Sequence, residues 1–119
     1  MLNLDTHMLV FALAGSLTAK ENHLLGSTSW GVSAIVFWEL AKLVQLGRLQ
    51  MDLESPEVVR SLSSVHVWPI DSAVSIASTH LDFSADPADE LIAATSVVHH
   101  VPLITRDRKI RRSKLVPLA

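Results

Sequence analysis

Cysteine is absent from the 119 residues of this chain. Its absence excludes disulfide bonds, thiolate zinc sites and a cysteine nucleophile, and it suits a reducing cytosol. Glycine-rich phosphate loops are missing too, because neither GxGxxG nor GKS/T occurs. No nucleophile-elbow pattern marks a serine hydrolase. We therefore expect a cytoplasmic protein whose chemistry comes from other side chains.

The chain also lacks a long hydrophobic run. The segment MLVFALAG (8–15) is too short to span a bilayer. The residues before it, MLNLDTH, contain no Lys or Arg and carry Asp5, which is the wrong charge for the start of a signal peptide. Neither membrane insertion nor export is expected.

The chain also lacks a large excess of either charge, since its formal net charge is only −2. A polyanion would therefore have to be met by a local basic patch. Hydrophobic residues make up 49% of the chain and charged residues 18%, which excludes a disordered chain. This length and composition predict one folded domain over residues 1–119.

Short apolar runs alternate with helical patterns along the chain. Strands are predicted at 1–4, 30–33, 65–70 and 102–105, with an edge strand at 114–118. Helices are predicted at 6–15, 19–26, 34–47, 55–64, 71–81 and 86–100. The predicted caps are Ser33, Ser55, Asp71 and Asp86, and the predicted stops are Gly15, Gly26 and Gly47. This order predicts an α/β fold, a three-layer α/β/α sandwich with a mostly parallel central sheet.

Four acidic residues fall where such a sheet binds ligands, near the carboxyl ends of its strands. Asp5 follows the first strand and Asp107 follows the strand at 102–105, whereas Asp89 and Glu39 lie near the starts of two helices. Glu39 has apolar neighbours, so its carboxylate needs a cation or strong donors, and Lys42 is the simplest partner. A second interpretation is that all four acids share one divalent cation. Hard oxygen ligands in this number suit Mg²⁺ or Mn²⁺.

Each acid also has an ordinary structural explanation. Asp86 before Pro87 is a good helix cap, and Asp89 at the third helical position suits a cap and a metal ligand equally. Asp5 and Asp107, taken singly, are explained as loop residues. The shared cation is favoured because four acids at one sheet edge would repel one another strongly without it.

Four blocks of sequence resemble, in the right order, the PIN-domain ribonucleases and specifically the VapC-type toxins of toxin–antitoxin pairs. The blocks are LDTHMLVFALAG, SAIVFWELAKLVQLGRL, VWPIDSA and DPADELIAATSVVHHVPLITRD. The resemblance implies a PIN-like fold and a metal-dependent endoribonuclease that hydrolyses RNA phosphodiester bonds with Mg²⁺ or Mn²⁺. It places the acidic ligands on Asp5, Glu39, Asp89 and Asp107, and the groups that support them on Thr6, Thr105 and Asp86. It also implies a cognate antitoxin and a homodimer.

Two features depart from the family pattern. Glu90 stands where Arg often follows the third acid, and the stretch between Asp5 and Glu39 is a few residues short. Neither departure removes an acidic ligand.

Six of the ten basic residues lie between positions 106 and 114. Such a cluster suits the backbone of a nucleic acid, and we expect RNA contacts from Arg106, Arg108 and Lys109. A solvated surface, or a face for an acidic partner, explains the cluster equally well.

Two other functions remain to be weighed. A non-catalytic PIN-fold binding module is one, and Glu90 keeps it open. The other is a phosphoacceptor receiver-like domain, which needs an acidic pair after the first strand and an Asp at the end of the third. Here Asp5 stands alone, and the strand at 65–70 is followed only by Asp71.

Overall fold

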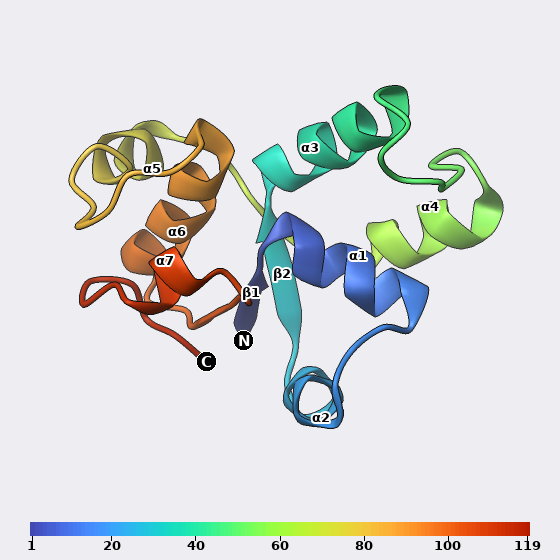
Figure 1. Ribbon diagram of the computed structural model, residues 1–119, viewed down its shortest axis with the longest axis horizontal. Coiled ribbons are helices and arrows are strands. Elements are labelled where there is room, and N and C mark those ends of the chain that lie inside the picture. The colour runs from blue at the N-terminus through green and yellow to red at the C-terminus, as the bar shows by residue number, and fades with distance from the viewer.

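Four parallel strands form the central sheet of the computed structural model, which describes residues 1–119 (Figure 1). The strands are β1 (Leu2–Leu4), β2 (Trp30–Ser33), β3 (His66–Trp68) and β4 (Leu103–Ile104). Their order across the sheet is β3-β2-β1-β4. The register pairs Leu4 with Val32 on one side and with Ile104 on the other. Asp5 after β1, Ser33 at the end of β2 and Thr105 after β4 therefore lie at the same level of the sheet.

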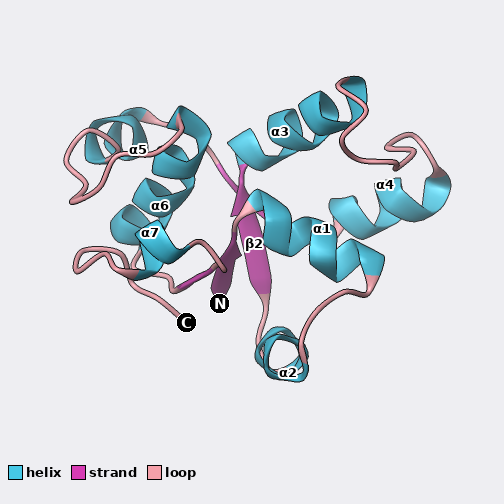
Figure 2. Cartoon of the chain, viewed as in Figure 1, coloured by secondary structure: helices cyan, strands magenta, loops and turns pink.

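Seven helices surround the sheet. They are α1 (Thr6–Ala14), α2 (Ala19–Gly26), α3 (Ala34–Gln45), α4 (Pro56–Ser63), α5 (Ser72–Ala77), α6 (Pro87–His99) and α7 (Arg108–Arg111). Helices α1 and α3 lie on one side of the sheet, and α5, α6 and α7 lie on the other (Figures 1 and 2). The predicted three-layer α/β/α arrangement is confirmed, and the sheet is parallel throughout.

The core lies between the central strands and the helices next to them. Leu4, Val32 and Leu103 are fully buried on adjacent strands, and they pack with apolar residues of α1, α3 and α6. Burial on both faces explains why these strands read as short apolar runs and not as alternating patterns. Strand β1 stands at the centre of this core.

The chain reverses its direction of travel across the sheet at β1. It moves outward from β1 through β2 to β3, and then returns to place β4 on the other side of β1. Such a switch point opens a crevice at the carboxyl ends of the two strands that flank it. Here those strands are β1 and β4, which lead directly into Asp5 and Thr105.

Several predicted boundaries are wrong by a few residues. Gly26 is the last residue of α2 and not its stop, because Ser27 ends the helix with its hydroxyl on the Leu24 carbonyl. The strand at 65–70 ends at Trp68, since Pro69 has no N–H for the ladder. The helix at 71–81 ends at Ala77, where serine and threonine hydroxyls bond back to backbone carbonyls.

The C-terminal segment differs more from its prediction. The expected edge strand at 114–118 is reduced to one bridge, in which Leu118 pairs in parallel with Leu103. Helix α7 was not predicted, because its sequence RKIR reads as a charged loop. Ile110 is buried against the core and anchors this short helix.

Helices in this chain fall short of the length and hydropathy that a bilayer crossing requires.

Candidate functional site

Asp5 is fixed at the switch point by two hydrogen bonds. Its Oδ1 accepts the Met8 backbone N–H at 2.8 Å and so caps α1. Its Oδ2 accepts the hydroxyl of Thr105, which follows β4. The side chain is buried, and burial raises its pKa above the ordinary value. Asp5 is thus a rigidly held carboxylate rather than a loop residue.

Asp107 is oriented by the backbone around it. Its own N–H donates to the Thr105 hydroxyl at 3.1 Å. Its Oδ1 accepts the N–H groups of Lys109 and Ile110 at 2.8 and 3.1 Å, and so caps α7. The Thr105 hydroxyl therefore contacts both Asp5 and the backbone of Asp107, and it couples two of the predicted acids.

Glu39 projects from the second turn of α3 and is partly buried. It accepts the hydroxyl of Thr6, the first residue of α1. Lys42, the alternative partner, instead donates to Gln45 at 3.0 Å. The ordinary interpretation of Glu39 as an ion pair with Lys42 is therefore wrong. Lys42 instead bonds to Gln45, about one helical turn further along α3.

Asp89 lies half-buried in the first turn of α6. Burial is the largest cause that raises its pKa to about 6, followed by the negative charges of three carboxylates that also raise it, those of Glu39, Asp5 and Asp107. The charges of the three other predicted acids thus all act on Asp89. The structure brings all four predicted acids into one electrostatic group.

Asp86 occupies the cap position of α6, but its side chain accepts no capping hydrogen bond. The prediction that its carboxylate caps the helix is wrong. The first turn already carries Asp89 and Glu90, so a third carboxylate folded over the helix end would be repelled. Asp86 instead stays exposed, and it adds to the charge that acts on Asp89.

Asn3 is a buried residue of the site that sequence reasoning missed. Its Nδ2 donates to the Ile92 carbonyl and to the Ser96 hydroxyl, both at 3.0 Å. These bonds fasten α6 to β1 and so hold Asp89 near Asp5. A single amide inside the apolar strand LNL was the available signal, since such a residue needs a partner when buried.

Two adjoining hollows are lined by three of the four acids, and Glu39 lines neither. One, of about 280 Å³, is lined by Asp5, Asp89, Asp107, His7 and Arg106 among others, and is called here the acidic hollow. The other, of about 430 Å³, shares Asp89 and Asp107 and adds Asp86 and Lys109. The same carboxylates thus face two connected spaces.

The donor set has the chemistry that a hard divalent cation requires. Glu39, Asp89 and Asp107 each keep at least one carboxylate oxygen that accepts no protein hydrogen bond. No three His, Asp or Glu side chains stand close enough together to hold an ion as they lie. The residues therefore fit a metal in type, and small side-chain rotations would be needed to close around it.

The predicted RNA-contacting residues differ in how far they are engaged. Arg106 donates to both oxygens of Glu21, at 2.9 and 2.7 Å, and lies 3.9 Å above the Phe11 ring. Lys109 donates to the Ser84 carbonyl at 2.9 Å beside the acids. Arg108 is exposed at the start of α7. Sequence gave no signal for Glu21 as the partner of Arg106, because 85 residues separate them.

Known proteins resemble this chain in sequence and in fold. Ribonuclease VapC22 of Mycobacterium tuberculosis (strain ATCC 25618 / H37Rv) is 36% identical over 84 residues. The match covers 67% of this chain and 64% of that protein, somewhat less than two thirds of its length.

Solved structures share the fold at lower identity. One is VapBC2 from Rickettsia felis bound to a DNA fragment from its promoter, with a TM-score of 0.74 and 17% identity over 100% of this chain and 98% of that one. Another is a toxin–antitoxin complex from Klebsiella pneumoniae, with a TM-score of 0.71 and 20% identity over 94% and 91%. At such identities the likeness establishes the fold alone.

Residues 3–114 match the PIN domain family, and this span includes all four acids of the site. The match covers nearly the whole chain. The chain belongs to the PIN domain family.

Proposed function

We propose that this chain is a metal-dependent endoribonuclease of the VapC type, the toxin of a toxin–antitoxin pair. The observation that carries the proposal is the convergence of Asp5, Asp89 and Asp107 on one solvent-facing hollow. The charges of Glu39, Asp5 and Asp107 all raise the pKa of Asp89, which agrees with this arrangement. The likeness to Ribonuclease VapC22 supports the same activity. Mg²⁺ or Mn²⁺ is the proposed cofactor, held by Asp5, Asp89, Asp107 and Glu39.

A divalent cation supplies, when bound, neutralisation of the phosphodiester oxygens and acidification of water. The chain's own residues provide the geometry for this chemistry. The Thr105 hydroxyl holds Asp5 Oδ2 and the Thr6 hydroxyl holds Glu39, so both carboxylates are aimed before a ligand arrives. Asp107 is locked through Oδ1, which leaves Oδ2 free. Hydrogen-bonded partners of this kind orient metal ligands, although the side chains would still have to rotate to close around an ion.

The charge of the site also bears on the substrate. The chain has one ion pair, Arg106 with Glu21, and it lies beside the acids without pairing to any of them. The carboxylates would repel an RNA phosphate unless a cation neutralised them. RNA is therefore the proposed substrate only with the cation in place.

Partners are proposed on the apolar surface of the N-terminal half. Phe37, Leu40, Leu53, Val59 and Leu62 line a hollow of about 370 Å³ between α3 and α4. Trp38 stands 56% exposed on α3. Exposed apolar surface of this kind marks interaction sites. An antitoxin and a second copy of the chain are the proposed partners, and the Klebsiella pneumoniae relative was solved as a toxin–antitoxin complex.

Cleavage of structured RNAs tests the proposed activity. The wild-type chain is expected to cleave with Mg²⁺ or Mn²⁺ and to stop when the metal is chelated. Asp89→Asn should reduce the rate at least about 100-fold. Loss of a residue that only hydrogen-bonds to a metal ligand already costs about 10–100-fold, and Asp89 is itself a proposed ligand. Asp89 accepts no protein hydrogen bond, so the amide should leave the fold intact.

Asp52→Asn is the matched control, since Asp52 is exposed in the loop before α4. It should cleave like the wild type. An inactive wild-type chain, or Asp89→Asn with undiminished cleavage, would refute the proposed activity.

A further inference from the structure

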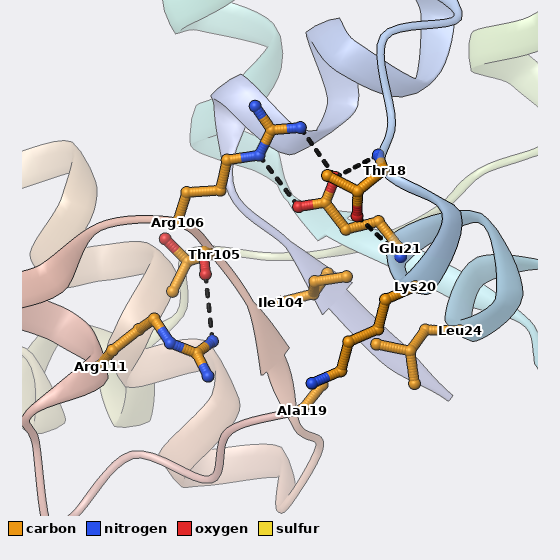
Figure 3. Close-up of a pocket in the computed structure, with 9 residues that line it drawn as sticks. All are labelled: Thr18, Lys20, Glu21, Leu24, Ile104, Thr105, Arg106, Arg111 and Ala119. Atoms are coloured by element: carbon orange, nitrogen blue, oxygen red, sulfur yellow. Dashed lines mark hydrogen bonds and ion pairs between the residues drawn. The ribbon is translucent and has the colours of Figure 1, made fainter.

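A third hollow, of about 220 Å³, lies between α2, β4 and α7. It is called here the basic hollow, after Lys20, Arg106 and Arg111 in its lining. Figure 3 shows Lys20 and Arg111 entering it from opposite sides, with Ile104 between them and Thr105 next to Arg111. Two cations from segments about 90 residues apart thus face one small space.

Lys20 and Arg111 form no ion pair with an acidic side chain. The chain's one ion pair joins Arg106 to Glu21, and so accounts for the only carboxylate side chain in the basic hollow. Arg111 donates through Nη1 to the Thr105 carbonyl at 3.2 Å, which positions the guanidinium and leaves its other N–H groups free. Lys20 is exposed at the start of α2. The basic hollow therefore has two available cations and attracts anions.

The three hollows are joined through shared residues. Arg106 lines both the basic hollow and the acidic hollow. Asp89 and Asp107 line the acidic hollow and the next one, where Lys109 stands. The carboxylates are thus flanked by Lys109 on one side and by Lys20 and Arg111 on the other. A chain of regularly spaced phosphates matches this order of charges, with one phosphate at the acids and others at the flanking cations.

We propose that the basic hollow binds a backbone phosphate of single-stranded RNA, next to the phosphate held at the acids. The inference rests on the proposed function, which supplies RNA as the substrate. The Arg111 guanidinium can donate two parallel hydrogen bonds to phosphate oxygens, and the Lys20 ammonium adds a point charge. Arg106 remains fixed on Glu21 and Phe11 as the wall between the two hollows.

The salt dependence of RNA binding tests the site without cleavage. A short fluorescein-labelled single-stranded RNA is titrated with the full chain over a range of monovalent salt, and anisotropy gives the affinity. A fixed concentration of Ca²⁺, in place of Mg²⁺ or Mn²⁺, neutralises the carboxylates. Each phosphate contact on a single strand contributes about 0.7 to the slope of log affinity against log salt. The double variant Lys20→Gln/Arg111→Gln removes this one phosphate contact and should therefore lower the slope by about 0.7. Lys20→Gln alone should lower the slope by part of this amount, and the Lys20 side chain has no hydrogen bond whose loss could disturb the fold.

Arg48→Gln/Arg60→Gln is the matched control, because it removes the same charge from two exposed residues outside all three hollows. Its slope should equal that of the wild type. An unchanged slope in the Lys20/Arg111 variant, an equal loss in the control, or a wild-type chain that binds no RNA would each overturn the inference.

The two proposals fail separately. A wild-type chain that never cleaves RNA, yet shows the specific loss of slope, would defeat the nuclease and support the phosphate site. A chain that cleaves RNA while its Lys20/Arg111 variant keeps the wild-type slope would defeat the phosphate site alone.

Discussion

At the scale of single residues, the hydroxyl of Thr105 contacts both Asp5 and the backbone of Asp107. Thr105 donates to Asp5 Oδ2 and accepts the N–H of Asp107, so it fixes one acid directly and another through its backbone. The Thr105 side chain is almost completely buried, so water cannot readily replace a hydrogen bond that is lost there. The position of both carboxylates therefore depends on the oxygen of this threonine.

Thr105→Val keeps the shape of the side chain and removes this oxygen. It should lower the free energy of unfolding by about 1–3 kcal/mol, because two buried polar groups lose their partner. It should also weaken Mn²⁺ binding about 10–100-fold. Urea unfolding and a Mn²⁺ titration measure the two effects. Thr105→Ser retains the hydroxyl and should recover the Mn²⁺ affinity, and a valine variant that binds Mn²⁺ as tightly as the serine variant would contradict this role.

At the scale of elements, the closeness of β2 to β3 depends on Gly31. A Cβ built on Gly31 would lie 2.5 Å from the His66 carbonyl oxygen and 3.0 Å from Trp68 Cζ3. Backbone oxygen cannot turn aside as a flexible side chain can, so the strands would have to separate. β2 leads into α3 and hence into Glu39. The packing of this strand pair thus affects the placement of one acid.

Gly31→Ala should therefore destabilise the chain by about 1–3 kcal/mol. Gly26→Ala is the matched control, since a Cβ there meets nothing within 4 Å and the residue is helical. It should be neutral or stabilise the fold by about 0.4–1 kcal/mol. Chemical unfolding of the two variants measures the contrast, and equal stabilities would show that the strand pair tolerates a side chain at Gly31.

The sequence predicted the elements that depend on local signals and missed those that depend on distant contacts. Ser33 and Ser55 cap α3 and α4 as expected, since a cap needs only its own neighbours. Helix α7 was missed because burial of Ile110, not local pattern, stabilises it. The Asp86 cap failed because the neighbouring acids repel it.

The four acids could be predicted, whereas their supports could be predicted only in part. Their positions after predicted parallel strands placed Asp5 and Asp107 at one edge of the sheet, and the resemblance named Thr6 and Thr105. The bonds of Asn3 to α6 and the pairing of Glu21 with Arg106 join residues more than 80 positions apart. No local pattern encodes such pairs.

At the scale of the whole molecule, Glu21 and Arg106 join α2 to the segment after β4. The ion pair holds the wall between the acidic and basic hollows, and Arg106 also donates to the Ser16 carbonyl at 3.2 Å. The hydrogen bonds from Arg106 are the largest cause that lowers the pKa of Glu21, to about 2. Folding therefore favours the ionised form of Glu21.

This pKa sets the direction of a pH effect. A carboxyl whose pKa falls on folding stabilises the folded state above its unfolded pKa of about 4.5, and this stabilisation is lost as the pH falls from there towards 2. Glu21→Gln should lower the thermal midpoint near neutral pH, and its difference from the wild type should shrink as the pH falls below about 4.5. Glu57→Gln, exposed on α4 and without an ion pair, should show no such difference. A Glu21→Gln deficit that stays constant with pH would contradict the pairing.

The central claim is that the four carboxylates share a divalent cation, and a Mn²⁺ titration of thermal stability tests it most directly. A ligand that binds only the folded state adds about 2.7 kcal/mol of stability at a concentration 100 times its Kd. The wild-type chain and Asp52→Asn should both gain stability with Mn²⁺, and Asp89→Asn should gain almost none. An equal gain in Asp89→Asn, or no gain in the wild type, would contradict the claim.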